Sequence, residues 1–158
     1  MRVTVCCLAV MGSVTMWTLD ASVVARSFDV NDPAQAVCLA LLDRLDRTAA
    51  PVIVPRLLLA ELAGAVRRLL QDPIRARLAV EAWQNLPHVQ FVTLDDALLD
   101  AAAVLAADRA LRGADAVYVA VAQRYTTTLV SLDREQRTRA APVVTVMTPH
   151  DALATLDA

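Results

Sequence analysis

Short apolar runs alternate with longer stretches of mixed polarity along most of the chain. Several of these runs are rich in β-branched residues, and prolines or polar residues bound them, which is typical of short strands covered on both faces. A strand is therefore expected at each of five places: Trp17–Asp20, Val52–Val54, Gln90–Leu94, Thr128–Leu132 and Val143–Met147.

The stretches between these runs carry apolar residues at helical spacing. The sequence Asn31-Asp32-Pro33 predicts a helix start, with the proline inside the first turn. Because strands and helices alternate, the pattern predicts an α/β fold, a three-layer α/β/α sandwich with a mostly parallel central sheet of four or five strands. Further helices are expected over Leu57–Leu70, after Asp72-Pro73, from Asp95 or Asp96 towards Leu111, over Ala114–Arg124 and as a terminal turn from Pro149.

The length of 158 residues suits one domain with a core of its own. Hydrophobic residues make up 57% of the chain and aromatic residues 4%, so the core is expected to consist largely of Val, Leu and Ala. Residues 16–158 are expected to form the domain. Residues 1–15 are interpreted as a loose extension or an early start, since their apolar run is interrupted and no signal cleavage site follows.

Composition excludes several common enzyme classes. The net charge is −2 and all 15 positive residues are Arg, so a P-loop or a pyridoxal phosphate site has no lysine to use. Three glycines are too few for G-x-G-x-x-G, and His88 and His150 lie far apart without an H-E-x-x-H motif. Three cysteines without C-x-x-C spacing make the cytoplasm the expected compartment, and no segment is apolar enough for a membrane span.

Four acidic residues lie beside apolar segments, where an unpaired charge is expensive to bury. Asp20 ends the first strand, Asp133 follows the fourth, Glu61 sits inside an apolar helix and Asp115 opens the most apolar helix. Each has a structural alternative: Asp115 and Asp133 as helix N-caps and Asp20 as a turn residue. Glu61 is the hardest to explain by structure, because a glutamate in mid-helix gains nothing from capping.

The expected sheet brings these acids to one edge, because sites in parallel α/β sheets form at the carboxyl ends of the strands. Four carboxylates in one pocket repel one another unless a cation compensates them. Hard oxygen ligands select Mg²⁺ or Mn²⁺ over zinc, and such ions suit phosphodiester hydrolysis by an activated water.

The local sequences around the four acids resemble the PIN domain, and especially the VapC-type toxins of bacterial type II toxin–antitoxin pairs. The resemblance spans roughly residues 16–148, and the segment around Asp115 is its most specific part. The matching segments are Leu19-Asp20-Ala21-Ser22, Pro55 to Ala63, Leu111-Arg112-Gly113-Ala114-Asp115-Ala116 and Leu129-Val130-Ser131-Leu132-Asp133.

The resemblance implies a Mg²⁺- or Mn²⁺-dependent endoribonuclease in which the four acids hold the metal. It also implies that Ser22 and Ser131 orient the carboxylates or a bound water, that the protein is a homodimer, and that a small antitoxin covers the groove. Whether Glu135 adds a ligand stays open. Arginines near the acids are candidates for contacts with the RNA phosphates; they are Arg112, Arg134 and Arg137.

Two alternatives keep the PIN fold: a nuclease of RNA processing without an antitoxin, and an inactive module that binds RNA or a partner. Two others fit less well. Receiver domains normally need a lysine near the phosphoacceptor, and phosphatases of the haloacid type need D-x-D after the first strand, where this chain has Ser22.

Overall fold

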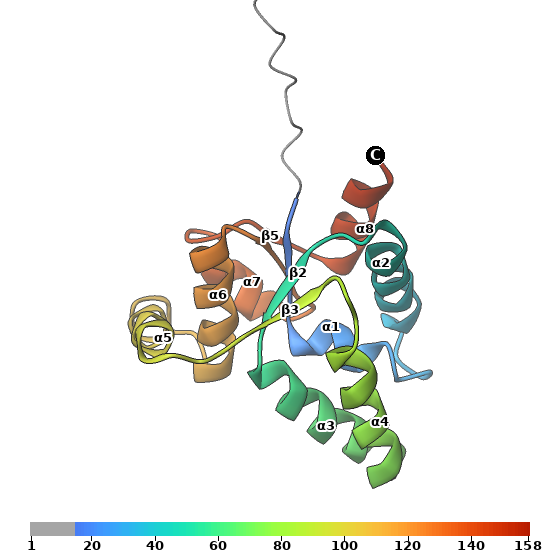
Figure 1. Cartoon of the computed structure of the whole chain (residues 1–158). Helices are drawn as coiled ribbons and strands as arrows, with labels where there is room; N and C mark the ends of the chain where they lie inside the picture. Colours follow the sequence, from blue (N-terminus) through green and yellow to red (C-terminus); the bar gives the residue numbers. More distant parts are fainter. Residues whose placement is uncertain (1–14) are drawn as a thin grey trace, which may run out of the picture.

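A computed structural model of the chain describes residues 15–158. The predicted N-terminal extension therefore lies outside the described residues, apart from Thr15. The fold is a five-stranded parallel sheet between two layers of helices (Figure 1), which confirms the predicted three-layer architecture. The strands are β1 (Trp17–Leu19), β2 (Val52–Pro55), β3 (Val89–Val92), β4 (Thr128–Val130) and β5 (Val146–Met147).

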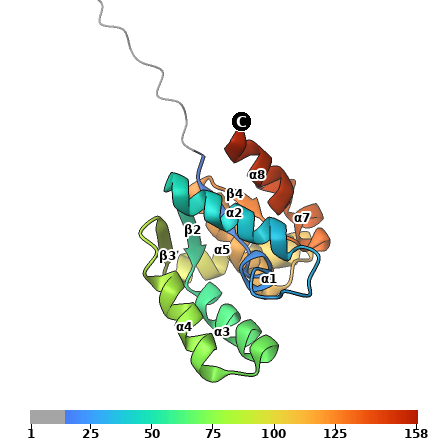
Figure 2. The ribbon, with the colours of Figure 1, turned by 90° about the vertical axis from the view of Figure 1, so that its right-hand side faces the viewer.

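Eight helices connect or follow the strands. Helices α5, α6 and α7 lie on one side of the sheet, and α2 and α8 lie on the other (Figures 1 and 2). The pair α3 and α4 extends beyond the sheet edge at which β1 and β2 end (Figure 1). The bounds are α1 Ala21–Arg26, α2 Gln35–Thr48, α3 Leu57–Leu70, α4 Pro73–Gln84, α5 Asp96–Arg109, α6 Gly113–Tyr125, α7 Arg134–Ala140 and α8 Pro149–Asp157.

The strand order is β3-β2-β1-β4-β5, so β1 lies at the centre of the sheet. The chain moves outward from β1 through β2 to β3, then returns to the other side of β1 to form β4 and β5. Because parallel crossovers are right-handed, this change of direction places the later connecting helices on the opposite face. The point where the order reverses lies between β1 and β4.

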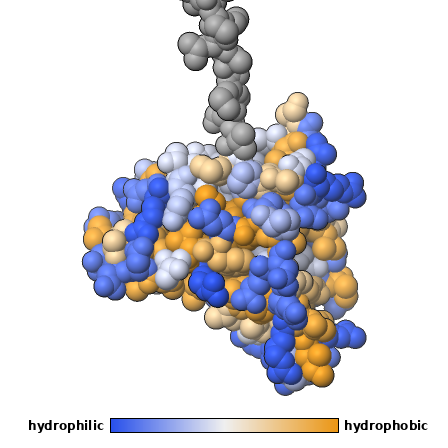
Figure 3. Space-filling model, viewed as in Figure 1, coloured by the Kyte–Doolittle hydropathy of each residue, from blue (hydrophilic) through white to orange (hydrophobic). Residues whose placement is uncertain are grey.

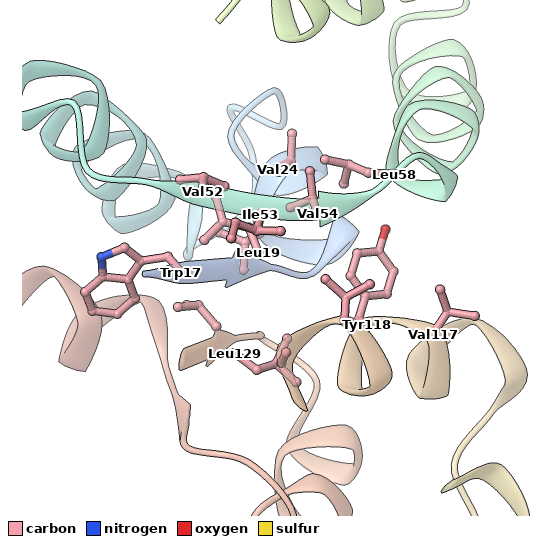
Figure 4. Packing of buried hydrophobic residues seen from close by; sticks show 14 of the residues in the cluster. Trp17, Leu19, Val24, Val52, Ile53, Val54, Leu58, Val117, Tyr118 and Leu129 are labelled. Carbon is pink, nitrogen blue, oxygen red and sulfur yellow. The ribbon is translucent and has the colours of Figure 1, made fainter. Parts of the chain in front are cut away.

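The core fills both sides of the central strands. Trp17 and Leu19 of β1 are fully buried, and Tyr118 on α6 is 1% exposed. Figure 4 shows these side chains packed with others from β2, β4, α1 and α3. Helix α6 is buried along most of its length, as its almost continuous apolar sequence predicted. Within residues 15–158, no helix is long and apolar enough to cross a membrane.

One short helix was missed, and one predicted helix start was wrong. The six-residue helix α1 was not predicted, because a single short helix carries too little apolar periodicity to be recognised. The predicted helix start at Asn31-Asp32-Pro33 is a turn, in which the Asp32 carboxylate accepts from the Ala34 N–H at 2.8 Å, and α2 begins at Gln35. The edge strands also differ from the prediction: β3 begins and ends earlier, and β5 is limited to Val146–Met147.

Candidate metal centre

The predicted acids at the strand ends meet at the point where the strand order reverses. The Asp20 N–H donates to the carbonyl oxygen of Val130 at 2.9 Å, which ties the residue after β1 to the end of β4. Asp133 follows three residues after Val130. In open α/β sheets this reversal leaves a crevice beyond the carboxyl ends of the strands. Asp20 and Asp133 therefore stand at the position where such folds bind ligands.

Both aspartates also begin a helix. The Asp20 carboxylate accepts from the Ser22 N–H at 2.9 Å and caps α1, so it is an N-cap and not only a turn residue. The Asp133 carboxylate accepts from the N–H groups of Glu135 and Gln136, at 2.8 and 3.0 Å, and caps α7 as its structural alternative predicted. Capping fixes where each carboxylate points, and the helix N-terminus favours its negative charge.

The other two acids come from helices. Glu61 lies in α3 and is half-buried, and its Oε2 accepts from the Tyr118 hydroxyl at 2.5 Å. Asp115 lies in the first turn of α6, where the N-cap is Arg112. The N-cap alternative for Asp115 is therefore wrong: this carboxylate is not used to start the helix that carries it.

Neighbouring acids influence the pKa values of Glu61 and Asp115. Burial raises the pKa of Glu61, the Tyr118 hydrogen bond opposes this rise, and Asp20 and Asp115 add to it. Burial also raises the pKa of Asp115, and the charges of Asp20 and Asp133 raise it further. Burial and the neighbouring Glu61 raise the pKa of Tyr118 far above its ordinary value, so it stays a neutral donor.

Within residues 15–158, the only arginine that forms an ion pair with an acid of this cluster is Arg112, at the rim. The Arg112 guanidinium is 72% exposed and lies 3.9 Å from the Asp133 carboxylate and 3.9 Å from that of Glu135. The hydrogen bonds to Asp20 and Glu61 from side chains come from neutral groups, Gln136 and Tyr118. The cluster therefore keeps most of its negative charge. Within residues 15–158, no three acidic, His or Cys side chains lie close enough to one another to hold a metal ion.

The two predicted serines hold the loops that carry the acids. Ser22 Oγ accepts from the Leu132 N–H at 3.3 Å, which links α1 to the loop after β4. Ser131 is fully buried, and its Oγ accepts from the Asp133 N–H at 3.0 Å. These contacts orient the backbone next to Asp20 and Asp133. A direct role of either serine towards a bound water stays a prediction.

The arginines predicted to bind RNA differ in their surroundings. Arg137 donates to the Ser131 carbonyl oxygen at 2.7 Å, so part of its guanidinium supports the loop after β4. Arg134 is exposed on α7. Glu135, whose role the sequence left open, is paired with Arg139 and lies near Arg112. The ion pair with Arg139 already compensates the Glu135 charge, whereas Asp20, Glu61 and Asp115 form no ion pair with an arginine of residues 15–158.

Sequence reasoning missed two residues of the site. Gln136 is 1% exposed, and its amide Nε2 donates to Asp20 Oδ1 at 3.3 Å. Asp133 and Gln136 have the spacing of a capping box, in which the glutamine would normally reach back to the N-cap N–H. Here Ser131 takes that N–H and Gln136 turns to Asp20 instead. Tyr118 follows Asp115 at helical i,i+3 spacing, a signal that places both on one face of α6.

Comparison with known proteins agrees with this geometry. The sequence profile of the PIN domain matches residues 18–142. No curated protein sequence matched the chain. Among solved structures, PAE2754 from Pyrobaculum aerophilum superposes with a TM-score of 0.66 at 21% identity, over 92% of this chain and 97% of that one.

Two further structures show the same fold. FitAcB from Neisseria gonorrhoeae has a TM-score of 0.65 at 22% identity, over 85% of this chain and 99% of that one. VapC20 from Mycobacterium tuberculosis, described as a sarcin-ricin loop cleaving toxin, has a TM-score of 0.63 at 19% identity, over 77% and 93% of the two chains. The profile match covers most of the sequence, and it includes all four acids of the cluster. The chain belongs to the PIN-domain family.

Proposed function

We propose that this protein is a divalent-metal-dependent endoribonuclease. The observation that carries the proposal is the cluster itself: the charges of neighbouring acids raise the pKa values of Glu61 and Asp115, and within residues 15–158 only Arg112, at the rim, forms an ion pair with a cluster acid, Asp133. Burial of such a cluster is costly unless a cation joins it. Family membership makes a nuclease the chemistry that this cluster serves best.

The donor set fits a hard divalent cation. All four side chains offer carboxylate oxygens, which favour Mg²⁺ or Mn²⁺ over zinc. Asp20, Glu61, Asp115 and Asp133 would hold the metal. When bound, it supplies a Lewis acid that activates water and stabilises negative charge on the phosphate.

The remaining residues of the site keep the carboxylates in place. Gln136 holds Asp20 from within the core, and Tyr118 holds Glu61 from α6. Both donors are neutral, so they orient the carboxylates without cancelling the charge that attracts a cation. Ser22 and Ser131 fix the loops after β1 and β4, and the exposed Arg112 at the rim would meet a phosphate oxygen of the RNA.

We also propose that the nuclease is the toxin of a toxin–antitoxin pair in the cytoplasm, that it forms a homodimer, and that a small antitoxin binds it. Several structures of similar fold support the partner: VapBC from Salmonella typhimurium, and a toxin–antitoxin complex from Klebsiella pneumoniae. A gene for a small protein beside the gene for this chain, whose product copurifies with it, would support the pair. Purification of this chain as a monomer with no small partner bound would favour a role in RNA processing.

The proposal is tested by incubating the purified protein with a pool of RNA and a pool of single-stranded DNA, with Mg²⁺, Mn²⁺ or EDTA. We expect cleavage of RNA that needs the metal and that is lost in Asp20→Asn and Asp115→Asn. Arg77→Ala, a change of an exposed residue on α4, is the control and should cleave as the wild type does. Undiminished cleavage in EDTA, or in both aspartate variants, would reject the mechanism. RNA binding without cleavage would identify an inactive module.

A further inference from the structure

A groove between α1 and α3 leads away from the acidic cluster. It has a volume of about 510 Å³. Ser22 and Glu61 line it, so it shares two side chains with the candidate metal centre. Small residues, among them Ala25 and Ala65, also line it, and they leave room for a ligand to approach both helices closely.

Two arginines line the same groove, and their surroundings differ. Arg26 on α1 is 51% exposed and is paired with Asp32 at 3.2 Å and with Asp29 at 4.0 Å. Arg68 on α3 has no acidic side chain within 4.0 Å in the part of the chain that the structure describes. Its guanidinium lies over Gly64, where a β-carbon would stand only 3.1 Å from Nη1. Arg68 therefore offers this groove a cation whose charge no carboxylate of the described residues compensates.

The spacing along α3 separates this cation from the acids. Arg68 follows Glu61 by seven residues, which corresponds to about 10 Å along a helix. A ligand that reaches both must be extended, and it must carry negative charge at the arginine end. The acidic end accepts negative charge only with a metal present. A nucleic-acid strand, whose phosphates repeat along its length, satisfies both conditions.

We propose that the groove between α1 and α3 holds the RNA strand next to the cleaved bond, and that Arg68 binds a phosphate neighbouring the one at the acids. This inference rests on the proposed function. Arg26 contributes less, because two aspartates already share its charge. On α7, part of the Arg137 guanidinium is already engaged with the loop after β4. Figure 3 shows polar and apolar surface side by side on the α3–α4 pair next to this groove.

The test measures RNA binding by fluorescence anisotropy of a labelled single-stranded RNA. Ca²⁺ replaces Mg²⁺, so that a hard cation compensates the acids, and a gel checks that the RNA stays intact. Arg68→Ala should weaken binding about tenfold, because a charge-assisted hydrogen bond to phosphate is lost. The slope of log affinity against log salt concentration should also become less steep by about 1, because one phosphate contact is lost. Arg68→Lys should restore part of the affinity. The matched control is Arg67→Ala, which removes the same charge from the next position of α3, outside the groove, where Arg67 contacts Gln71.

Three outcomes would overturn the inference. The first is that the wild type does not bind RNA, and the second is an equal loss of RNA affinity in Arg68→Ala and Arg67→Ala. The third is that Arg68→Ala weakens the binding of an oligoglutamate peptide but not the binding of RNA. The last would make the groove a protein-docking surface. Metal-dependent cleavage by the wild type, with unchanged RNA affinity in Arg68→Ala, would reject the groove and keep the proposed function. If the wild type does not cleave RNA but Arg68→Ala selectively loses RNA affinity, the groove is supported and the proposed function is rejected.

Discussion

Two groups of carboxylates in this molecule have opposite electrostatic surroundings. Asp72 and Asp95 begin α4 and α5. Hydrogen bonds from the backbone N–H groups of Arg75 and Ile74 lower the pKa of Asp72, and the Arg124 guanidinium, followed by the Leu98 N–H, lowers the pKa of Asp95. In the metal-centre cluster, burial and neighbouring acids instead raise the pKa values of Glu61 and Asp115.

The difference separates structural acids from functional ones. At Asp72 and Asp95 the fold stabilises the charged carboxylate, so the charge contributes to folding. At Glu61 and Asp115 the fold makes the charged form less favourable than in the unfolded chain. Groups kept in such surroundings are concentrated at functional sites. The raised pKa values of Glu61 and Asp115 therefore distinguish these two acids from the helix caps Asp72 and Asp95.

The largest expected effect is a loss of activity combined with a gain in stability. Asp115→Asn should reduce RNA cleavage by at least about a hundredfold, since even indirect contacts to metal ligands are worth 10- to 100-fold. In EDTA the same change should raise the melting temperature, because it removes repulsion from Asp20 and Asp133. Asp95→Asn is the matched control: it should leave cleavage unchanged and lower the melting temperature. If cleavage and melting temperature changed in the same way in both variants, the two groups of carboxylates would not differ in function.

A smaller effect is expected where a neutral donor holds a cluster acid. Gln136→Met keeps the volume of the side chain and removes the hydrogen bond to Asp20. We expect about a tenfold weaker affinity for Mn²⁺, measured by calorimetry, because ligands lose affinity when their outer contacts are removed. Gln84→Met, at the exposed end of α4, is the control. Unchanged affinity in folded Gln136→Met would show that the buried amide serves packing alone.

The pH dependence of stability should also divide the two groups. For Glu61 and Asp115 the pKa is higher in the folded than in the unfolded chain, so the metal-free folded state loses stability as pH rises from about 4 towards neutrality. For Asp72 and Asp95 the pKa is lower in the folded chain, so their contribution is present above pH 4 and is lost as pH falls. Urea unfolding of Asp115→Asn should therefore show a growing advantage over the wild type as pH rises. An advantage that stays constant with pH would argue against a raised pKa.

The fold was largely predictable because its central elements carry strong local patterns. The apolar run Ala114–Arg124 predicted α6 to within one residue at each end, and β2 and β4 were located by their β-branched residues. Helix α1 was missed because six residues cannot show a helical repeat. The turn at Asp32 was misread because Asp before Pro begins turns as readily as helices.

The sequence indicated the positions of the four acids and of Ser22 and Ser131, but it did not indicate the contacts of Gln136 and Tyr118 with the acids. Strand ends identify Asp20 and Asp133 from local sequence, since parallel strands end at one edge. Gln136 contacts Asp20 across 116 positions, and Tyr118 contacts Glu61 across 57. Such contacts depend on which strands are neighbours, and local patterns do not contain the order β3-β2-β1-β4-β5. The groove between α1 and α3 escaped prediction for the same reason.

Calorimetric titration of the metal-free protein with Mn²⁺ tests the central claim most directly. The wild type and Asp95→Asn should bind the ion with similar affinity, and Asp20→Asn and Asp115→Asn should bind it at least about a hundredfold more weakly. Failure of the wild type to bind Mn²⁺, or equal binding by all four proteins, would contradict the assignment of the four carboxylates as a metal centre.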